Sequence, residues 1–332
     1  MGCCSSSYSQ PQPVQSKFFP DFEKALPRLE GKVVVITGCT TGTGFVCART
    51  CAKLGAHVVM LNRASDRATS AHAAISALGK ATSIACDLGS FSSVRAAIAE
   101  VQRLFGETGV DVLCNNAGVM ALEDKATGDG YDVQMQTNHL SHFMLTKDLF
   151  PLLEKAAALR GEARVVQHSS VARKLPAIPL DTSHLGKNGG NLGGNGASML
   201  FGGARWKRYH QTKLANAIFC HTLAAKLAAK GSTVKSLCAA PGFAATNLQV
   251  TTHQQGGMSE TCIMRFAQSA EDGTMPLLHC CIGPEAMNGQ FFEPKGMGGR
   301  AVRKDLEKIC TDPKACETLW SQSEAACGEW KL

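Results

Sequence analysis

Tyr209 and Lys213 stand four residues apart in the segment Tyr-His-Gln-Thr-Lys. On an α-helix this spacing places both side chains on one face, so the phenol and the ammonium are expected to point into one pocket. A phenol ionises near pH ~10, and a nearby cation brings it toward the range useful for proton transfer at neutrality. The pair therefore predicts Tyr209 as an acid/base group tuned by Lys213. Because surface helices also carry this spacing by chance, the interpretation depends on the elements that precede the pair.

The first of these elements is a strand at residues 32–36, followed by Thr-Gly-Cys-Thr-Thr-Gly-Thr-Gly and a helix rich in alanine and cysteine. Glycines let a backbone approach a pyrophosphate closely, and the free N–H groups at a helix N-terminus bind its negative charge. The spacing is Gly-x-x-x-Gly-x-Gly rather than the commoner Gly-x-Gly-x-x-Gly. The residues predicted to hold a dinucleotide here are Gly38, Thr40, Gly42, Thr43 and Gly44.

A second strand, at residues 57–61, ends at Asn62 and Arg63. An acid at this position would bind the ribose hydroxyls of NAD, whereas an arginine accommodates the additional phosphate of NADP. Arg63 therefore favours NADP(H). The alternative is a solvated charge at a helix start, with Asp66 close by.

The next strands, at residues 82–86 and 110–114, also end in residues suited to a cofactor. Asp87 and Leu88 follow the first of them, where the carboxylate is placed to recognise an adenine amino group or to cap the next helix. Asn115, Ala117 and Gly118 follow the second, where small residues leave room and asparagines tie down the sheet edge. Strands that alternate with helices predict a parallel sheet.

Together these motifs resemble the short-chain dehydrogenase/reductase family over residues 31–294. The resemblance implies one α/β domain with a doubly wound, Rossmann-type parallel sheet. It also implies that Tyr209 transfers a proton, that Lys213 lowers its pKa and holds the nicotinamide ribose, and that Ser170 rather than Ser169 binds the reacting oxygen. The remaining implied residues are Asn138, which supports a water relay, and Pro241, Gly242 and Thr246, which close over the nicotinamide.

Within the family, residues 115–120, 137–143 and 213–219 look like the branch of retinol dehydrogenases, the WW-domain oxidoreductase and protochlorophyllide reductases. Members of that branch mostly prefer NADP(H). Phe243 stands where protochlorophyllide reductases carry a cysteine, which weakens the light-driven alternative. Phe243 also opens an apolar loop that in the family forms much of the substrate pocket. Packing of this loop on the core is the other interpretation.

The stretch between Ser170 and Tyr209 is unusually long, and residues 180–205 hold eight glycines without a regular period. Such a loop is expected to be a lid, a binding surface or a disordered segment. Arg205, Lys207 and Arg208 follow it, and they are predicted to flank the cofactor site or to face solvent. Without the aromatic interleaving of a base-stacking surface, and with a net charge of only +7, they do not indicate nucleic-acid binding.

The first 30 residues are predicted to be a disordered tail rich in serine, glutamine and proline. Gly2 is a candidate for myristoylation, and Cys3 and Cys4 for palmitoylation; two acyl chains would make membrane attachment durable. No cleavable signal, C-x-x-C motif or bilayer-spanning apolar run occurs, so the fifteen cysteines are expected to be reduced and cytoplasmic. No metal site is predicted: neither the pair Cys47 and Cys51 nor His139-x-x-His142 has the ligands that zinc needs.

The sequence therefore predicts an NADP(H)-dependent oxidoreductase that acts on an apolar aldehyde, ketone or alcohol at a membrane surface. Two alternatives remain: a steroid or tetrapyrrole reductase of the same fold, and a non-catalytic, membrane-tethered scaffold that binds NADP(H). An intact set of Ser170, Tyr209 and Lys213 argues against the scaffold. Residues 295–332 are expected to be a helical extension. A homodimer through the helix carrying Tyr209 stays open, because the glycine-rich insertion could block or replace that contact.

Overall fold

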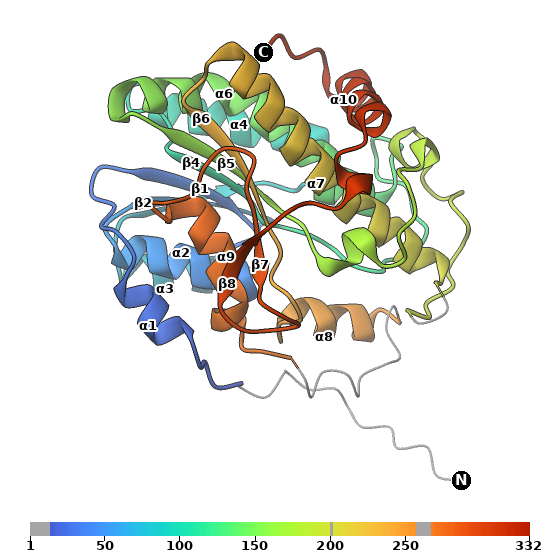
Figure 1. The fold of residues 1–332 in the computed structure, drawn as a ribbon, viewed down its shortest axis with the longest axis horizontal. Helices are drawn as coiled ribbons and strands as arrows, with labels where there is room; N and C mark the ends of the chain where they lie inside the picture. The colour runs from blue at the N-terminus through green and yellow to red at the C-terminus, as the bar shows by residue number, and fades with distance from the viewer. Residues whose placement is uncertain (1–13, 200–201, 257–266) are drawn as a thin grey trace.

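The computed structural model describes residues 14–199, 202–256 and 267–332, which form one layered α/β unit around an eight-stranded sheet (Figure 1). The strand order is β3-β2-β1-β4-β5-β6-β7-β8, with all neighbours parallel except the antiparallel pair β7 and β8. The strands are β1 (Val33–Thr37), β2 (His57–Asn62), β3 (Ala81–Ala85), β4 (Val112–Asn115), β5 (Ala163–His168), β6 (Val234–Ala239), β7 (Phe291–Pro294) and β8 (Ala301–Lys304).

Helices cover both faces of the sheet (Figure 1). Alternate residues of β1 enter separate cores because strand side chains point to opposite faces: Val33 and Val35 pack with α4, α6 and α7, whereas Val34 and Ile36 pack with α2 and α9. The helices are α1 (Phe19–Lys24), α2 (Gly42–Lys53), α3 (Asp66–Ser76), α4 (Phe91–Phe105), α5 (Val133–Met135), α6 (Ser141–Arg160), α7 (Ala204–Lys230), α8 (Asn247–Gln254), α9 (Ala270–Ile282) and α10 (Pro313–Cys327).

The chain reverses its direction of travel across the sheet between β1 and β4. From β1 it proceeds outward to β2 and β3, then crosses back to β4 on the other side of β1. In parallel α/β sheets such a reversal opens a crevice at the carboxyl ends of the strands, where ligands bind. The predicted cofactor motifs after β1 and β4 therefore meet at one point. The doubly wound, parallel fold class is confirmed.

The N-terminal boundary of the folded unit differs from the sequence prediction. Residues 14–30 are not a featureless tail, because they include α1 and are fixed to the body of the protein. The backbone N–H groups of Lys17, Phe18 and Phe19 donate to the Asp272 carboxylate at 2.8–2.9 Å. Phe19 is buried against the core that contains α9. Gly2, Cys3 and Cys4 lie outside the described residues.

The C-terminal extension predicted to be helical begins with a strand instead. β8 pairs antiparallel with β7, and the Lys304 ammonium lies 2.9 Å from the Glu293 carboxylate across the pair. The helical part, α10, packs against α7. There Trp320 stacks on Trp330 with ring centroids 5.1 Å apart, and both rings contact the Phe143 ring. The sheet edge and this aromatic cluster make the extension part of the fold.

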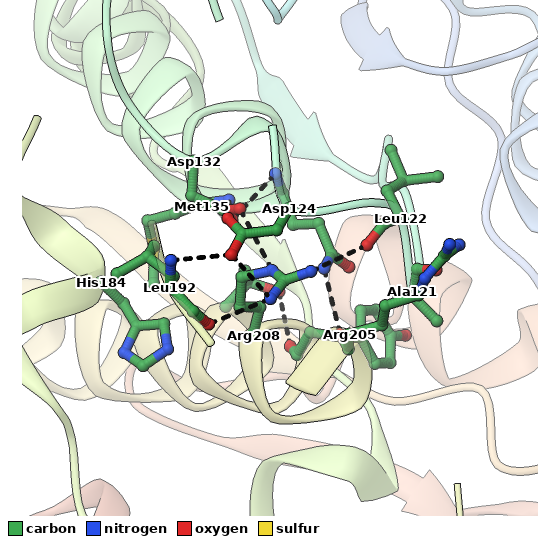
Figure 2. Close-up of polar contacts among 12 residues, drawn as sticks. Ala121, Leu122, Asp124, Asp132, Met135, His184, Leu192, Arg205 and Arg208 are labelled. Carbon is green, nitrogen blue, oxygen red and sulfur yellow. Dashed lines mark hydrogen bonds and ion pairs between the residues drawn. The ribbon is translucent and has the colours of Figure 1, made fainter. Parts of the chain in front are cut away.

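The glycine-rich insertion is folded where the structure describes it, and it contains a short 3₁₀ helix at Thr182–Leu185. Arg205, Lys207 and Arg208 were expected to flank the cofactor site or to face solvent, and the two arginines do not face solvent. Arg208 is fully buried and Arg205 is 7% exposed, while Lys207 is exposed. Both arginines bind the insertion and the loop after β4. Figure 2 shows Arg208 between Leu192 of the insertion and Leu122 of that loop. Among the described residues, no helix is long and apolar enough to span a bilayer.

Candidate active site

Tyr209 and Lys213 lie on the second and third turns of α7, with Ser170 opposite them at the end of β5. Tyr209 is 5% exposed, and the Ser170 hydroxyl lies close enough to its phenol to influence the phenol pKa. The Lys213 ammonium lies 5.8 Å from the centre of the Tyr209 ring and donates to the His168 carbonyl at 2.9 Å. The Ser169 hydroxyl instead donates to the Lys213 carbonyl, so Ser170 is the serine placed at the phenol.

The ionisation of this pair differs from the sequence expectation. Burial raises the pKa of Tyr209 to about 12, and the hydrogen bond from Ser170 only partly offsets this effect. Burial also lowers the pKa of Lys213 to about 8. The net shift of the Tyr209 pKa is therefore upward, and the lowering by Lys213 that the resemblance implies stays a prediction. In both cases the largest cause is desolvation, which disfavours the charged form of each group.

Asn138 lies in a π-helical segment, η1 (Gln136–Leu140), that interrupts the start of α6, and such segments are frequent at functional sites. Its side-chain amide donates to the Val119 carbonyl and to the Thr212 hydroxyl, both at 2.9 Å. A Cβ added at Gly118 would lie 3.3 Å from both the Asn138 Oδ1 and the Lys213 Nζ. The two predicted side chains thus flank the backbone of Gly118.

The glycines after β1 are required by close backbone approaches. A Cβ on Gly44 would lie 2.1 Å from the Gly38 carbonyl oxygen, and one on Gly38 would lie 2.9 Å from the Ala117 Cα. Gly42 has a φ of +60°, which favours glycine. The N-cap residue Thr41 makes no side-chain cap, so the first N–H groups of α2 are open to a ligand. This cradle fits the pyrophosphate of a dinucleotide.

A polar network that sequence reasoning did not assign to the site fixes the cradle. Asn116 donates to the Thr37 and Gly38 carbonyls and accepts from the Thr43 hydroxyl at 3.0 Å. The Thr37 hydroxyl accepts the N–H groups of Asn116 and Ala117 and lies 3.0 Å from the His142 Nε2. The sequence placed asparagines at this edge, but only the fold shows that Asn116 joins the two loops.

His142 bonds the Asn138 carbonyl through its other ring nitrogen, so that nitrogen carries the proton and Nε2 accepts from Thr37. Burial lowers the pKa of His142 to about 4, which keeps the ring neutral. His142 therefore connects the segment of Asn138 to the strand before the glycine cradle.

Other predicted cofactor residues have mixed placements. Arg63 is exposed after β2, where Asn62 accepts the backbone N–H of Cys39 and holds the glycine loop. Asp87 is exposed and accepts the N–H of Gly89; it is not the cap of α4, because Ser90 takes that position. Leu88 is buried beside it, and Thr40 is half-buried in the glycine loop.

Asn115 connects the end of β4 to α6. Its side chain is fully buried and donates to the Thr146 hydroxyl on α6 at 3.0 Å. Such a contact holds β4 to α6. The role of Asn115 in cofactor binding stays a prediction.

The segment after β6, which begins at Pro241, was predicted to close over the nicotinamide. Gly242 has a φ of +65°, and a Cβ there would lie 2.6 Å from the Met297 carbonyl oxygen. The Pro241 carbonyl accepts from the Gln268 amide, and Phe243 is bonded through its backbone to Met297 and Gln268. Phe243 and Thr246 are half-buried. Of the other apolar residues expected in this loop, Leu248 packs against the cluster of Tyr209, whereas Met258, Ile263 and Met264 lie outside the described residues.

The histidines and cysteines find structural partners in the described part of the chain. His139 is buried and bonds the Ser323 hydroxyl at 2.9 Å, while His142 bonds Thr37, so the two rings serve different contacts. Cys47 lies near Cys114 and Cys281, with the three sulfurs within 4.8 Å of one another in the apolar core. The described cysteines are free thiols, and nearly all are buried as small apolar residues.

Together, the crevice at the reversal point, the glycine cradle and the Ser170–Tyr209–Lys213 set define a dinucleotide-binding oxidoreductase fold. The family model described as short chain dehydrogenase matches residues 32–180. Human retinol dehydrogenase 12 is 32% identical, over 89% of this chain and 86% of that protein. Mouse polyprenol dehydrogenase is 30% identical, over 90% and 84%.

A crystal structure of an uncharacterized protein from Mycobacterium paratuberculosis superposes with a TM-score of 0.72 at 30% identity, covering 96% of this chain and all of that one. The chain belongs to the short-chain dehydrogenase/reductase family, on its retinol dehydrogenase-like branch. It is thus an oxidoreductase of a family that acts on alcohol and carbonyl groups.

Proposed function

We propose that this protein is an NADP(H)-dependent oxidoreductase that interconverts an apolar aldehyde or ketone and its alcohol. The observation that carries the proposal is the placement of Ser170 near the buried Tyr209, which belongs to a small apolar cluster. That cluster contains Met120, Ala121 and Tyr209, with Trp206, Leu248 and Ala172 packed against it. The human and mouse relatives are named for retinol and polyprenol, both apolar alcohols, which supports the same substrate class.

When bound, the nicotinamide would supply or accept the hydride. Tyr209, which is neutral at pH 7 and whose pKa burial raises further, would donate its proton to the reacting oxygen during reduction. Ser170 would hold that oxygen by a hydrogen bond and stabilise its developing charge. Lys213 and Asn138, which lie next to Gly118, would hold the backbone of Gly118 in place beside Ser170 and Tyr209. Arg63, exposed after β2, supports NADP(H) over NAD(H), because its guanidinium is available for a phosphate.

The test is nicotinamide absorbance over time with purified protein, NADPH or NADH, and a panel of retinal, aliphatic aldehydes and steroid ketones. Tyr209→Phe is run alongside as the matched variant, since it removes only the phenol oxygen. NADPH consumption that disappears in the variant supports the reductase. Binding of NADPH without turnover of any substrate in either direction would favour the scaffold alternative, and faster turnover with NADH would refute the role of Arg63.

We further propose that Gly2 is myristoylated and that Cys3 or Cys4 is palmitoylated, which would hold the enzyme at the surface where apolar substrates partition. Labelling of cells with a clickable myristate analogue tests the first lipid. A signal on the wild type that is lost in Gly2→Ala supports it. Equal labelling of the two proteins would end the proposal.

A further inference from the structure

The start of α7 carries four long side chains immediately before Tyr209, namely Arg205, Trp206, Lys207 and Arg208. Trp206 is three residues before Tyr209 and therefore on the same side of the helix. The two ring centroids are 6.0 Å apart, edge to face at 86°. Met120 and Leu248 belong to the same cluster, which is separate from the two cores that stabilise the sheet. Trp206 is thus a large, half-buried aromatic surface beside the proton-donating phenol.

The position of the Trp206 ring depends on the insertion. Its indole N–H donates to the Ala197 carbonyl at 2.9 Å. Residues 192–195 of the insertion are in turn bound by buried charges. Arg208 donates to the Leu192 and Gly194 carbonyls at 3.1 and 2.9 Å, and Asp124 accepts the N–H groups of the same two residues at 2.8 Å (Figure 2).

Arg205 connects this insertion to the other segments around Tyr209. Its guanidinium donates to the Asn195 carbonyl at 3.2 Å and to the Gln255 carbonyl, just after α8, at 3.0 Å. A longer contact of 3.5 Å reaches the Ala121 carbonyl in the loop after β4 (Figure 2). The planar guanidinium has several donors in fixed directions, so one side chain can hold three backbone segments. These segments carry Met120, Leu248 and the acceptor of the Trp206 indole.

We infer that Trp206 contacts the apolar body of the substrate and determines specificity, and that Arg205 is a positioning residue that holds the insertion, the loop after β4 and α8 around it. The inference rests on the proposed function for the substrate contact. The bracing by Arg205 is a property of the folded chain alone. Trp206 would favour long apolar carbonyl compounds over short ones, because only the former reach the indole while their carbonyl is at Tyr209.

The test compares Trp206→Ala and Arg205→Met with Lys207→Met. Lys207→Met is the matched control for Arg205→Met. It removes one positive charge from the same turn of α7, but at an exposed side chain. Each protein is assayed with NADPH and either retinal or propanal, and the NADPH dissociation constant is measured by fluorescence. Backbone hydrogen exchange is followed in residues 192–196 and 252–255.

Trp206→Ala is expected to raise KM for retinal roughly tenfold or more, the value of an aromatic contact, while KM for propanal and NADPH affinity change less than about twofold. Arg205→Met is expected to raise KM for retinal and to speed hydrogen exchange in both segments. Lys207→Met should match the wild type. If the ratio of KM for retinal to KM for propanal is unchanged in Trp206→Ala, Trp206 does not determine specificity. If backbone hydrogen exchange is unchanged in Arg205→Met, Arg205 does not hold these segments in place. If the wild type reduced no carbonyl, the role of Trp206 would fall with the proposed function, while the exchange data would still decide the brace.

Discussion

Replacement of Arg208 by methionine is the sharpest test of how the insertion is held. Arg208 is fully buried, and its guanidinium lies 3.7 Å from the Asp124 carboxylate and 3.5 Å from that of Asp132 (Figure 2). Removing one partner of a buried charge pair leaves the other charge uncompensated, which typically costs about 3–5 kcal/mol. Methionine keeps the apolar bulk, so the loss reports the charge and its hydrogen bonds. We expect Arg208→Met to lower the free energy of unfolding by about 3 kcal/mol at pH 8.

The cost should depend on pH with a definite sign. Burial raises the pKa of Asp132 to about 6, although the N–H of Met135 and the charge of Arg208 pull it back. The attraction between Arg208 and this carboxylate is present above that pKa and is lost as the pH falls through about 6. The difference between wild type and Arg208→Met should therefore be smaller at pH 5 than at pH 8.

Urea unfolding followed by circular dichroism measures the free energy of unfolding at pH 8 and at pH 5 without using the fluorescence of Trp206. Lys207→Met serves as the control at an exposed position. The control should stay within about 0.5 kcal/mol of the wild type at both pH values. A cost for Arg208→Met no larger than that of the control, or a cost that grows as the pH falls, would refute the reasoning.

Three further predictions concern the cradle, the C-terminal helix and the edge of the sheet. Gly44→Ala should weaken NADPH binding and destabilise the fold by at least about 1–3 kcal/mol, because its Cβ would meet backbone 2.1 Å away; Gly128→Ala, with nothing within 4 Å, should do neither in the same titration. Trp320→Ala should cost about 3–5 kcal/mol in urea unfolding because it empties the aromatic cluster under α10, whereas the exposed Glu317→Ala on the same helix should cost little. Burial alone would raise the pKa of Glu307, but hydrogen bonds from Arg173 and a neighbouring lysine lower it to about 2. Its contribution is thus present above its unfolded pKa of 4.5 and lost as the pH falls toward 2, so Glu307→Gln should cost about 1 kcal/mol at pH 7 and converge with the wild type in that acid range.

The sequence predicted the strands well because their signals are local. The β-branched run before Gly38 forms β1 within one residue of its expected bounds, and the run after His57 forms β2. It failed at residues 301–304, which were expected to be helical. A four-residue stretch has little pattern of its own, and it becomes β8 because β7 offers an edge with which to pair.

The candidate site was predicted as a set of residues but not as an electrostatic environment. Spacing alone put Tyr209 and Lys213 on one face of a helix, as the structure has them. It did not show that burial raises one pKa to about 12 and lowers the other to about 8, since desolvation depends on what the rest of the chain packs around them. Asn116 had the local signal of a turn residue, but its bonds to two loops are contacts between residues about 80 positions apart.

By itself, the sequence determined the alternation of strands and helices between residues 31 and 294, the glycine turn and the spacing of the reactive side chains, because each of these is set by neighbours a few residues away. Tertiary structure alone decided the surroundings of Arg205 and Arg208. A run of basic residues usually faces solvent, yet here the insertion and two aspartates surround Arg208 completely. Buried charges require partners, and those partners come from segments that only the folded chain brings together.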